Sequence, residues 1–126
     1  MRNYKVRSSH DATPEPGDIV YWERQTRKGL LRFLGVLEAE HDQVSHPFPG
    51  APTISVVSFA ARVRMYVKSP SGPKEPGGFD FYRTPKIRRP FTWRLFKVTP
   101  ENHFGFGCYG EGVIGDIKEA EARRKK

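Results

Sequence analysis

Cysteine is nearly absent from this chain, since Cys108 is the only one among 126 residues. A single cysteine excludes an intramolecular disulfide and a zinc site built on paired thiolates, so the core must rest on packing. His41, Asp42 and His46 are the nearest approach to a ligand set, and they match no recognised metal motif. We therefore expect neither a metal nor another cofactor.

Long hydrophobic runs are also missing. The longest nearly apolar stretch, 54–61, is interrupted by Ser55 and Ser58 and falls far short of the roughly 20 residues that a spanning helix needs. Residues 1–10 alternate charges with small polar residues and contain no apolar run of the kind a secretory signal requires. These absences predict a cytoplasmic protein with no membrane partner.

Amphipathic helical patterns are scarce, whereas turn-forming residues are common, with 11 prolines and 12 glycines. Hydrophobic residues make up 37% of the chain, enough for a real core. We expect an all-β fold of five to seven strands, arranged as a small antiparallel barrel or sandwich. It would form a single β domain over 18–117, preceded by an extended arm over 1–17 and followed by a basic tail over 118–126.

The strands are predicted from alternation and from β-branched or aromatic residues. Leu30–Glu40 also fits helical spacing, but the short preceding turn, 24–29, favours a hairpin and therefore a strand. The predicted strands are 19–23, 30–40, 53–68, 79–82, 91–98, 104–109 and 113–117. The predicted loops and turns are 41–52, 69–78, the basic segment 83–90, and 99–102. From Asp116 onward good helix formers predict a short frayed helix or a solvated tail.

Two segments resemble known families. The run from Pro16 to Trp22 (PGDIVYW), with its charged turn and second strand, looks like the first hairpin of SH3-like barrels, and this resemblance favours that barrel. Residues 102–109 (NHFGFGCY) are similar to the RNP1 octamer of RNA-recognition motifs at Phe104, Gly105, Phe106 and Tyr109. They depart from it at the start and at Gly107, and the chain lacks the two amphipathic helices of that fold. The alternative is a glycine-kinked edge strand.

Charge is the most informative feature. The formal net charge is +8, of which the last four residues, 123–126, supply four. The segment from Phe79 to Lys97 contains six basic residues and only one acidic residue, interleaved with aromatics. This pattern is typical of nucleic-acid binding, because cations neutralise phosphates and aromatic faces stack on unpaired bases. Alternation over 53–68 places four further candidates on one strand face. The candidate binding residues are Arg62, Arg64, Tyr66, Lys68, Tyr82, Arg83, Lys86, Arg88, Arg89, Trp93 and Arg94.

These residues predict a small basic module that recognises a polyanion, most plausibly single-stranded or structured nucleic acid. The alternative is a protein-interaction module, an inhibitor or adaptor that docks on an acidic surface of a larger complex, because complementary charge also steers protein encounters. An alternative for the aromatics is that they form the core, with the bases on a solvated outer face. The sequence does not specify the oligomeric state.

Support for an enzyme is weak. No Gly-x-Ser-x-Gly elbow, P-loop or Gly-x-Gly-x-x-Gly fingerprint occurs in the chain. The polar groups that a reaction would need gather only near the glycine-rich segment, as Glu101, His103, Cys108 and Glu111. In a strand, the odd spacing of His103 and Cys108 would put them on opposite faces. We therefore assign no catalytic residue.

Overall fold

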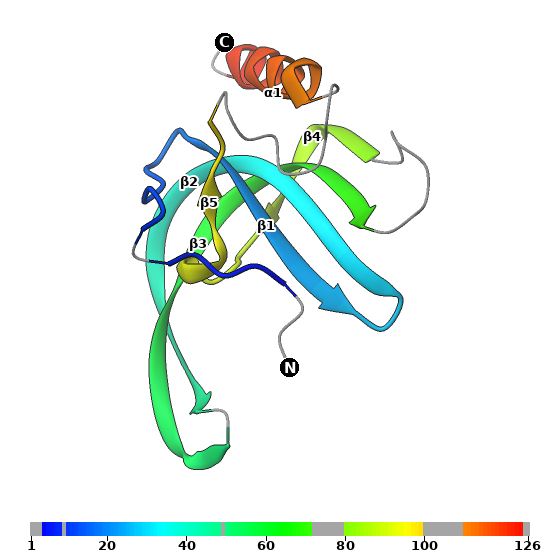
Figure 1. Cartoon of the computed structure of the whole chain (residues 1–126). Helices are drawn as coiled ribbons and strands as arrows, with labels where there is room; N and C mark the ends of the chain where they lie inside the picture. The colour runs from blue at the N-terminus through cyan, green and yellow to red at the C-terminus, as the bar shows by residue number, and fades with distance from the viewer. Residues whose placement is uncertain (1–3, 9, 49, 72–79, 100–109, 125–126) are drawn as a thin grey trace.

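The computed structural model describes residues 4–8, 10–48, 50–71, 80–99 and 110–124. They form one antiparallel sheet of five strands in the order β4-β3-β2-β1-β5, with a single helix packed against it (Figure 1). The strands are β1 (Ile19–Thr26), β2 (Gly29–Phe48), β3 (Ala51–Ser71), β4 (Asp80–Arg88) and β5 (Phe96–Lys97). The all-β, antiparallel prediction is confirmed. The sheet is not closed, since β4 and β5 are its two edges.

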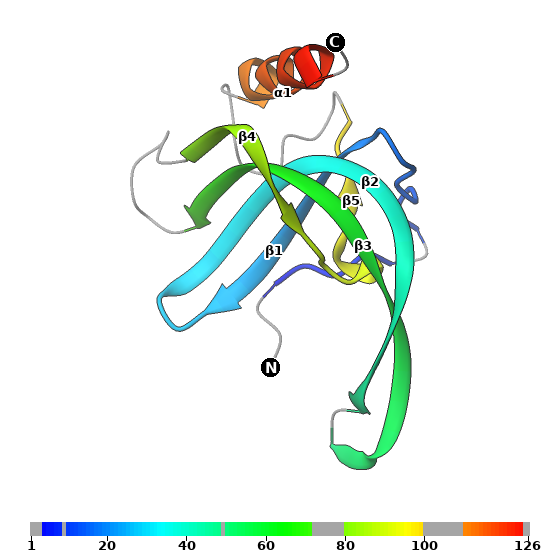
Figure 2. The same cartoon turned by 180° about the vertical axis from the view of Figure 1, so that it is seen from behind.

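The largest correction concerns the predicted loop 41–52. β2 and β3 continue through it as a hairpin arm, here called the arm and defined as residues 40–60, which projects from the rest of the sheet in both views (Figures 1 and 2). Pro47 is compatible with a ribbon because its backbone faces the open edge of β2, where no N–H donor is needed. Pro52 lies beside the tip, where the register shifts between the pairs Pro47–Ser55 and Phe48–Ala51. The turn itself is confined to the tip, where Gly50 has a φ of +82°.

Three other predictions are wrong in part. The basic segment 83–90 is mostly strand, because β4 runs to Arg88. The predicted strand 91–98 is interrupted by the short 3-10 helix η1 (Thr92–Arg94). The predicted turn 24–29 is smaller than expected, since β1 reaches Thr26 and β2 starts at Gly29, whose φ is +125°. The predicted strand 104–109 and most of the loop 69–78 lie outside the described residues.

The predicted strand Val113–Ile117 is instead part of the helix α1 (Gly110–Arg124). Val113 and Ile117 are one helical turn apart, and both are buried against the sheet. α1 therefore crosses the boundary that we placed between residues 117 and 118. None of the helices in the described ranges is long and apolar enough to span a membrane.

A bulge in β3 decides which side chains reach which face. Leu34 pairs with Val67 and Gly35 pairs with Met65, so Tyr66 is an extra residue in β3. Gly35 is required here because a Cβ at this position would lie 2.4 Å from the Arg64 carbonyl oxygen. The alternation of β3 is thus reversed beyond the bulge.

Both faces of the sheet carry a buried cluster. The cluster under α1 contains the buried residues Tyr21, Leu34, Val36, Tyr66, Val67, Phe96, Val113 and Ile117. The cluster on the other face contains Val20, Trp22, Phe33, Leu37, Ala61, Val63, Met65 and Leu95. The N-terminal segment lies across the sheet, since the Lys5 N–H donates to Glu23 and the Arg7 N–H donates to the Trp93 carbonyl.

Candidate functional site

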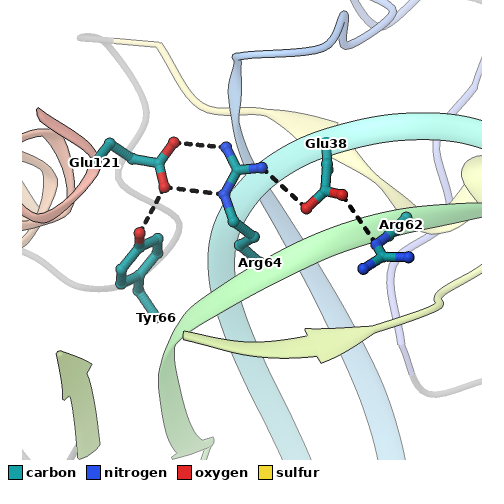
Figure 3. A network of polar contacts seen from close by, with 5 residues as sticks. All are labelled: Glu38, Arg62, Arg64, Tyr66 and Glu121. Carbon is teal, nitrogen blue, oxygen red and sulfur yellow. Dashed lines mark hydrogen bonds and ion pairs between the residues drawn. The ribbon is translucent and has the colours of Figure 1, made fainter. Parts of the chain in front are cut away.

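Three of the predicted binding residues, Arg62, Arg64 and Tyr66, belong to one polar network that reaches α1 through Glu121 (Figure 3). Arg64 donates through Nε to Glu121 (3.0 Å) and through Nη1 to Glu38 (3.0 Å). Tyr66 donates its hydroxyl to the same Glu121 carboxylate. Arg62 Nε lies 3.0 Å from Glu38, as an ion pair without an aligned hydrogen bond.

The ionisation of this network is set by its burial and mutual contacts. Burial alone would raise the pKa of Glu121, but the hydrogen bonds from Arg64 and Tyr66 outweigh it and lower that pKa. Burial and the bond to Glu121 raise the pKa of Tyr66 to about 12. The two acids compensate both arginines, and Tyr66 is fully buried. Arg64 and Tyr66 therefore hold α1 to the sheet through Glu121, and Glu38 links Arg62 to Arg64.

Lys68 does not share the face of Arg62 and Arg64, contrary to the alternation that we expected over 53–68. The bulge at Tyr66 turns Val67 toward the α1 side and Lys68 toward the opposite side. There Lys68 lines a cleft of about 400 Å³. The residues that line this basic cleft are Trp22, Arg24, Phe33, Met65, Lys68, Arg88, Arg89, Pro90 and Arg94.

The basic cleft collects cations from elements far apart in the sequence. Arg24 comes from β1, Lys68 from β3, Arg88 from β4, and Arg89 and Arg94 from the segment between β4 and β5. None of the described residues that line it is acidic. Five positive side chains around one cavity create a positive potential that favours an anion.

Trp22 and Phe33 form the apolar side of the basic cleft. Their rings stack at 5.2 Å with an interplanar angle of 17°, and each is only 4% exposed. Arg24 lies over the Phe33 ring at 5.9 Å. Because these rings already contact each other and the core, they support the cations rather than present open faces for stacking.

A cluster of aromatic rings holds Arg94 in place. Its guanidinium carbon lies 4.5 Å from the Tyr4 ring centre and 5.0 Å from that of Trp93. The Nη2 of Arg94 also donates a hydrogen bond to the Tyr4 hydroxyl. Trp93 itself stacks with Phe91 at 5.6 Å. Trp93 thus positions Arg94, and this aromatic cluster ties the N-terminal segment to one wall of the cleft.

The predicted residues of β4 fall on two faces. Lys86 lies opposite Met65 in the ladder, and its Nζ is 4.7 Å above the Tyr82 ring, beside the basic cleft. Arg83 instead borders a hollow shared with the acidic residues Asp116 and Glu119 of α1. The basic segment 83–90 is therefore not one surface, because strand alternation separates Arg83 from Lys86 and Arg88.

Sequence reasoning missed Arg24 because we placed it in a turn. The signal was present, since Val20, Trp22 and Arg24 alternate along β1 and Val20 and Trp22 belong to one cluster. Of the residues weighed for catalysis, Glu101, His103 and Cys108 lie outside the described part of the chain. His41, Asp42 and His46, weighed as metal ligands, fall on β2, within the arm.

Comparison with known proteins adds no assignment. No family model, curated protein or solved structure matches this chain.

Proposed function

We propose that this protein binds nucleic acid, in single-stranded or structured form, through the basic cleft. The observation that carries the proposal is the convergence of Arg24, Lys68, Arg88, Arg89 and Arg94 on one cavity with no acid among its described lining residues. Phosphate is the ligand that such a surface favours, because guanidinium and ammonium groups release its condensed counterions on binding. The function is stoichiometric binding.

Phosphate contacts carry more of this proposed interaction than base stacking does. Tyr66 is buried under α1, and Trp93 is packed between neighbouring rings and Arg94. Among the aromatics that we first considered, Tyr82 is half-buried beneath Lys86. We therefore expect weak dependence on base sequence and strong dependence on salt.

Fluorescence anisotropy with labelled single-stranded and double-stranded oligonucleotides tests the proposal. Each phosphate contact contributes a slope of roughly −0.7 to log K against log salt for a single strand. With three to five cations in contact, we expect a slope of about −2 to −3.5. Absence of binding at low salt would overturn the proposal.

Nuclease treatment distinguishes the proposed nucleic-acid partner from the alternative partner, an acidic protein surface. A pulldown from lysate should lose its partners when nucleic acid is digested. Partners that survive digestion would instead favour docking on protein.

A cytoplasmic location and an SH3-like barrel remain parts of the proposal. Cell fractionation tests the location, and an experimental structure tests the barrel.

A further inference from the structure

The arm extends beyond the strands that flank it. The pairing of β1 with β2 ends at Val36, and the pairing of β4 with β3 ends at Val63, with one isolated bridge between Ala60 and Phe91. Over 40–48 and 51–59 the described sheet has only two strands. A two-stranded ribbon is marginal in water without a third strand or a packed face, so this element is suited to acquire a partner strand.

Charged side chains are also missing from most of the arm, from Gln43 to its end at Ala60. None of the 22 Lys and Arg or 14 Asp and Glu residues lies between Gln43 and Ala61. Ile54 and Phe59 are large apolar residues with exposed fractions of 56% and 50%. Charged side chains are the usual protection of an open strand edge, and this segment has none.

The outer edge of β3 offers hydrogen-bonding groups without the interruption by proline that the β2 edge has at Pro47. Ala61 donates its N–H to the Pro90 carbonyl, so the odd-numbered residues of β3 turn their backbone groups to this side. Along the arm these are Ser55 and Val57, and none of the described strands pairs with them on this edge. On the other strand Pro47 lies opposite Ser55, and its backbone faces the β2 edge without an N–H.

We propose that the β3 edge over 53–59 pairs with the same edge of a second copy of this chain, antiparallel about a two-fold axis near Val56. Such a pairing is self-complementary, because each edge offers the donors and acceptors that the other needs. It joins two ribbons into a four-stranded sheet and covers β-branched, uncharged residues. This inference is independent of the proposed function.

Charge favours pairing at the arm over contact between the bodies, because all 22 Lys and Arg residues lie outside the arm. Arg62, where the body begins, is six residues from Val56, or about 20 Å of strand. Antiparallel pairing would therefore hold the two bodies about 40 Å apart. This exceeds the screening length of about 8 Å at physiological salt, so their like charges would not oppose the dimer.

Sedimentation velocity on nuclease-treated full-length protein, over a wide concentration series, tests this. The wild type should associate to a dimer at both low and high salt, since the paired edges carry no charge. Ser55→Lys should raise the dimer dissociation constant by roughly tenfold or more, because the two lysines would be diagonal neighbours across the axis, each beside Val57 of the other copy, and would repel each other. The matched control is Ser45→Lys, which adds the same charge at an exposed position on β2.

Mixing Ser55→Lys with Ser55→Glu should restore the dimer, because the two copies then carry opposite charges. Circular dichroism establishes that each variant is folded. A wild type that stays monomeric throughout, or an equal effect of Ser45→Lys and Ser55→Lys, would overturn the inference. Loss of oligonucleotide binding in Ser55→Glu, whose carboxylate would repel phosphate, together with a gain in Ser55→Lys, would assign this edge to nucleic acid and overturn the inference as well.

Discussion

At the scale of single residues, Glu121 changes the interpretation of a whole strand face. From the sequence, Arg62, Arg64 and Tyr66 were candidates for phosphate and base contacts. Glu121 reaches back from α1 to bind both Arg64 and Tyr66, and Glu38 compensates the remaining positive charge. The same residue types that suit a phosphate site therefore form an internal network.

Glu121→Gln should lower the free energy of unfolding by about 1–3 kcal/mol at neutral pH, as expected for lost hydrogen bonds to a charged group. The pKa of Glu121 is lowered in the folded state from an ordinary value of 4.5. The contribution of the Glu121 carboxylate to the free energy of unfolding is thus present above pH 4.5. It is lost as pH falls through the folded-state pKa. Urea unfolding across this range should show the wild type and variant converging in acid, and a difference that does not change with pH would contradict this.

Gly35→Ala should destabilise the protein by about 1–3 kcal/mol, the usual cost of overpacking. The reason is the contact of 2.4 Å between a new Cβ and the Arg64 carbonyl, which would push β2 and β3 apart at the bulge. Gly115→Ala is the matched control because Gly115 is exposed in α1 with open space around its missing Cβ. The control should gain about 0.5–1 kcal/mol in denaturant unfolding, and equal effects would contradict the explanation.

At the scale of elements, the strand 53–68 was predictable because its alternation is long and clear. The strand 19–23 was predicted from its β-branched and aromatic residues, and 30–40 from the short turn before it. The arm was not, since three prolines and a glycine within 47–52 resemble a loop, and only pairing between β2 and β3 fixes the ribbon. Val113–Ile117 was mistaken for a strand because a short apolar run fits either period. Its contacts with the sheet decide in favour of a helix.

Ile117→Ala tests the role of α1 as part of the core. Ile117 is fully buried beneath the helix, so the variant should lose about 2–5 kcal/mol of stability in thermal or urea unfolding. Lys118→Ala, at the next and exposed position, is the control and should change stability by less than about 0.5 kcal/mol. Similar losses in both variants would mean that α1 does not pack as described.

At the scale of the whole molecule, the positive charge is divided between opposite faces. Sequence reasoning found Lys68, Arg88, Arg89 and Arg94, which line the basic cleft. It also found Arg64 and Arg83, which lie beside α1, and Arg62, which joins Arg64 through Glu38. It could not separate the two groups, because the separation depends on the bulge at Tyr66 and on β4 being a strand. Arg24 joins the cleft because β1 continues through it to Thr26 instead of ending in the predicted turn.

The comparison of two double variants in oligonucleotide binding tests the central claim most directly. Lys68→Ala/Arg88→Ala removes two charges from the basic cleft, and Arg83→Ala/Arg123→Ala removes two charges beside α1. By anisotropy across a salt series, the cleft variant should weaken binding at low salt by roughly tenfold or more and reduce the slope by about 1.4. The α1-side variant should bind within about threefold of wild type. Equal weakening by both pairs would contradict a localised site and would mean that only net charge drives binding.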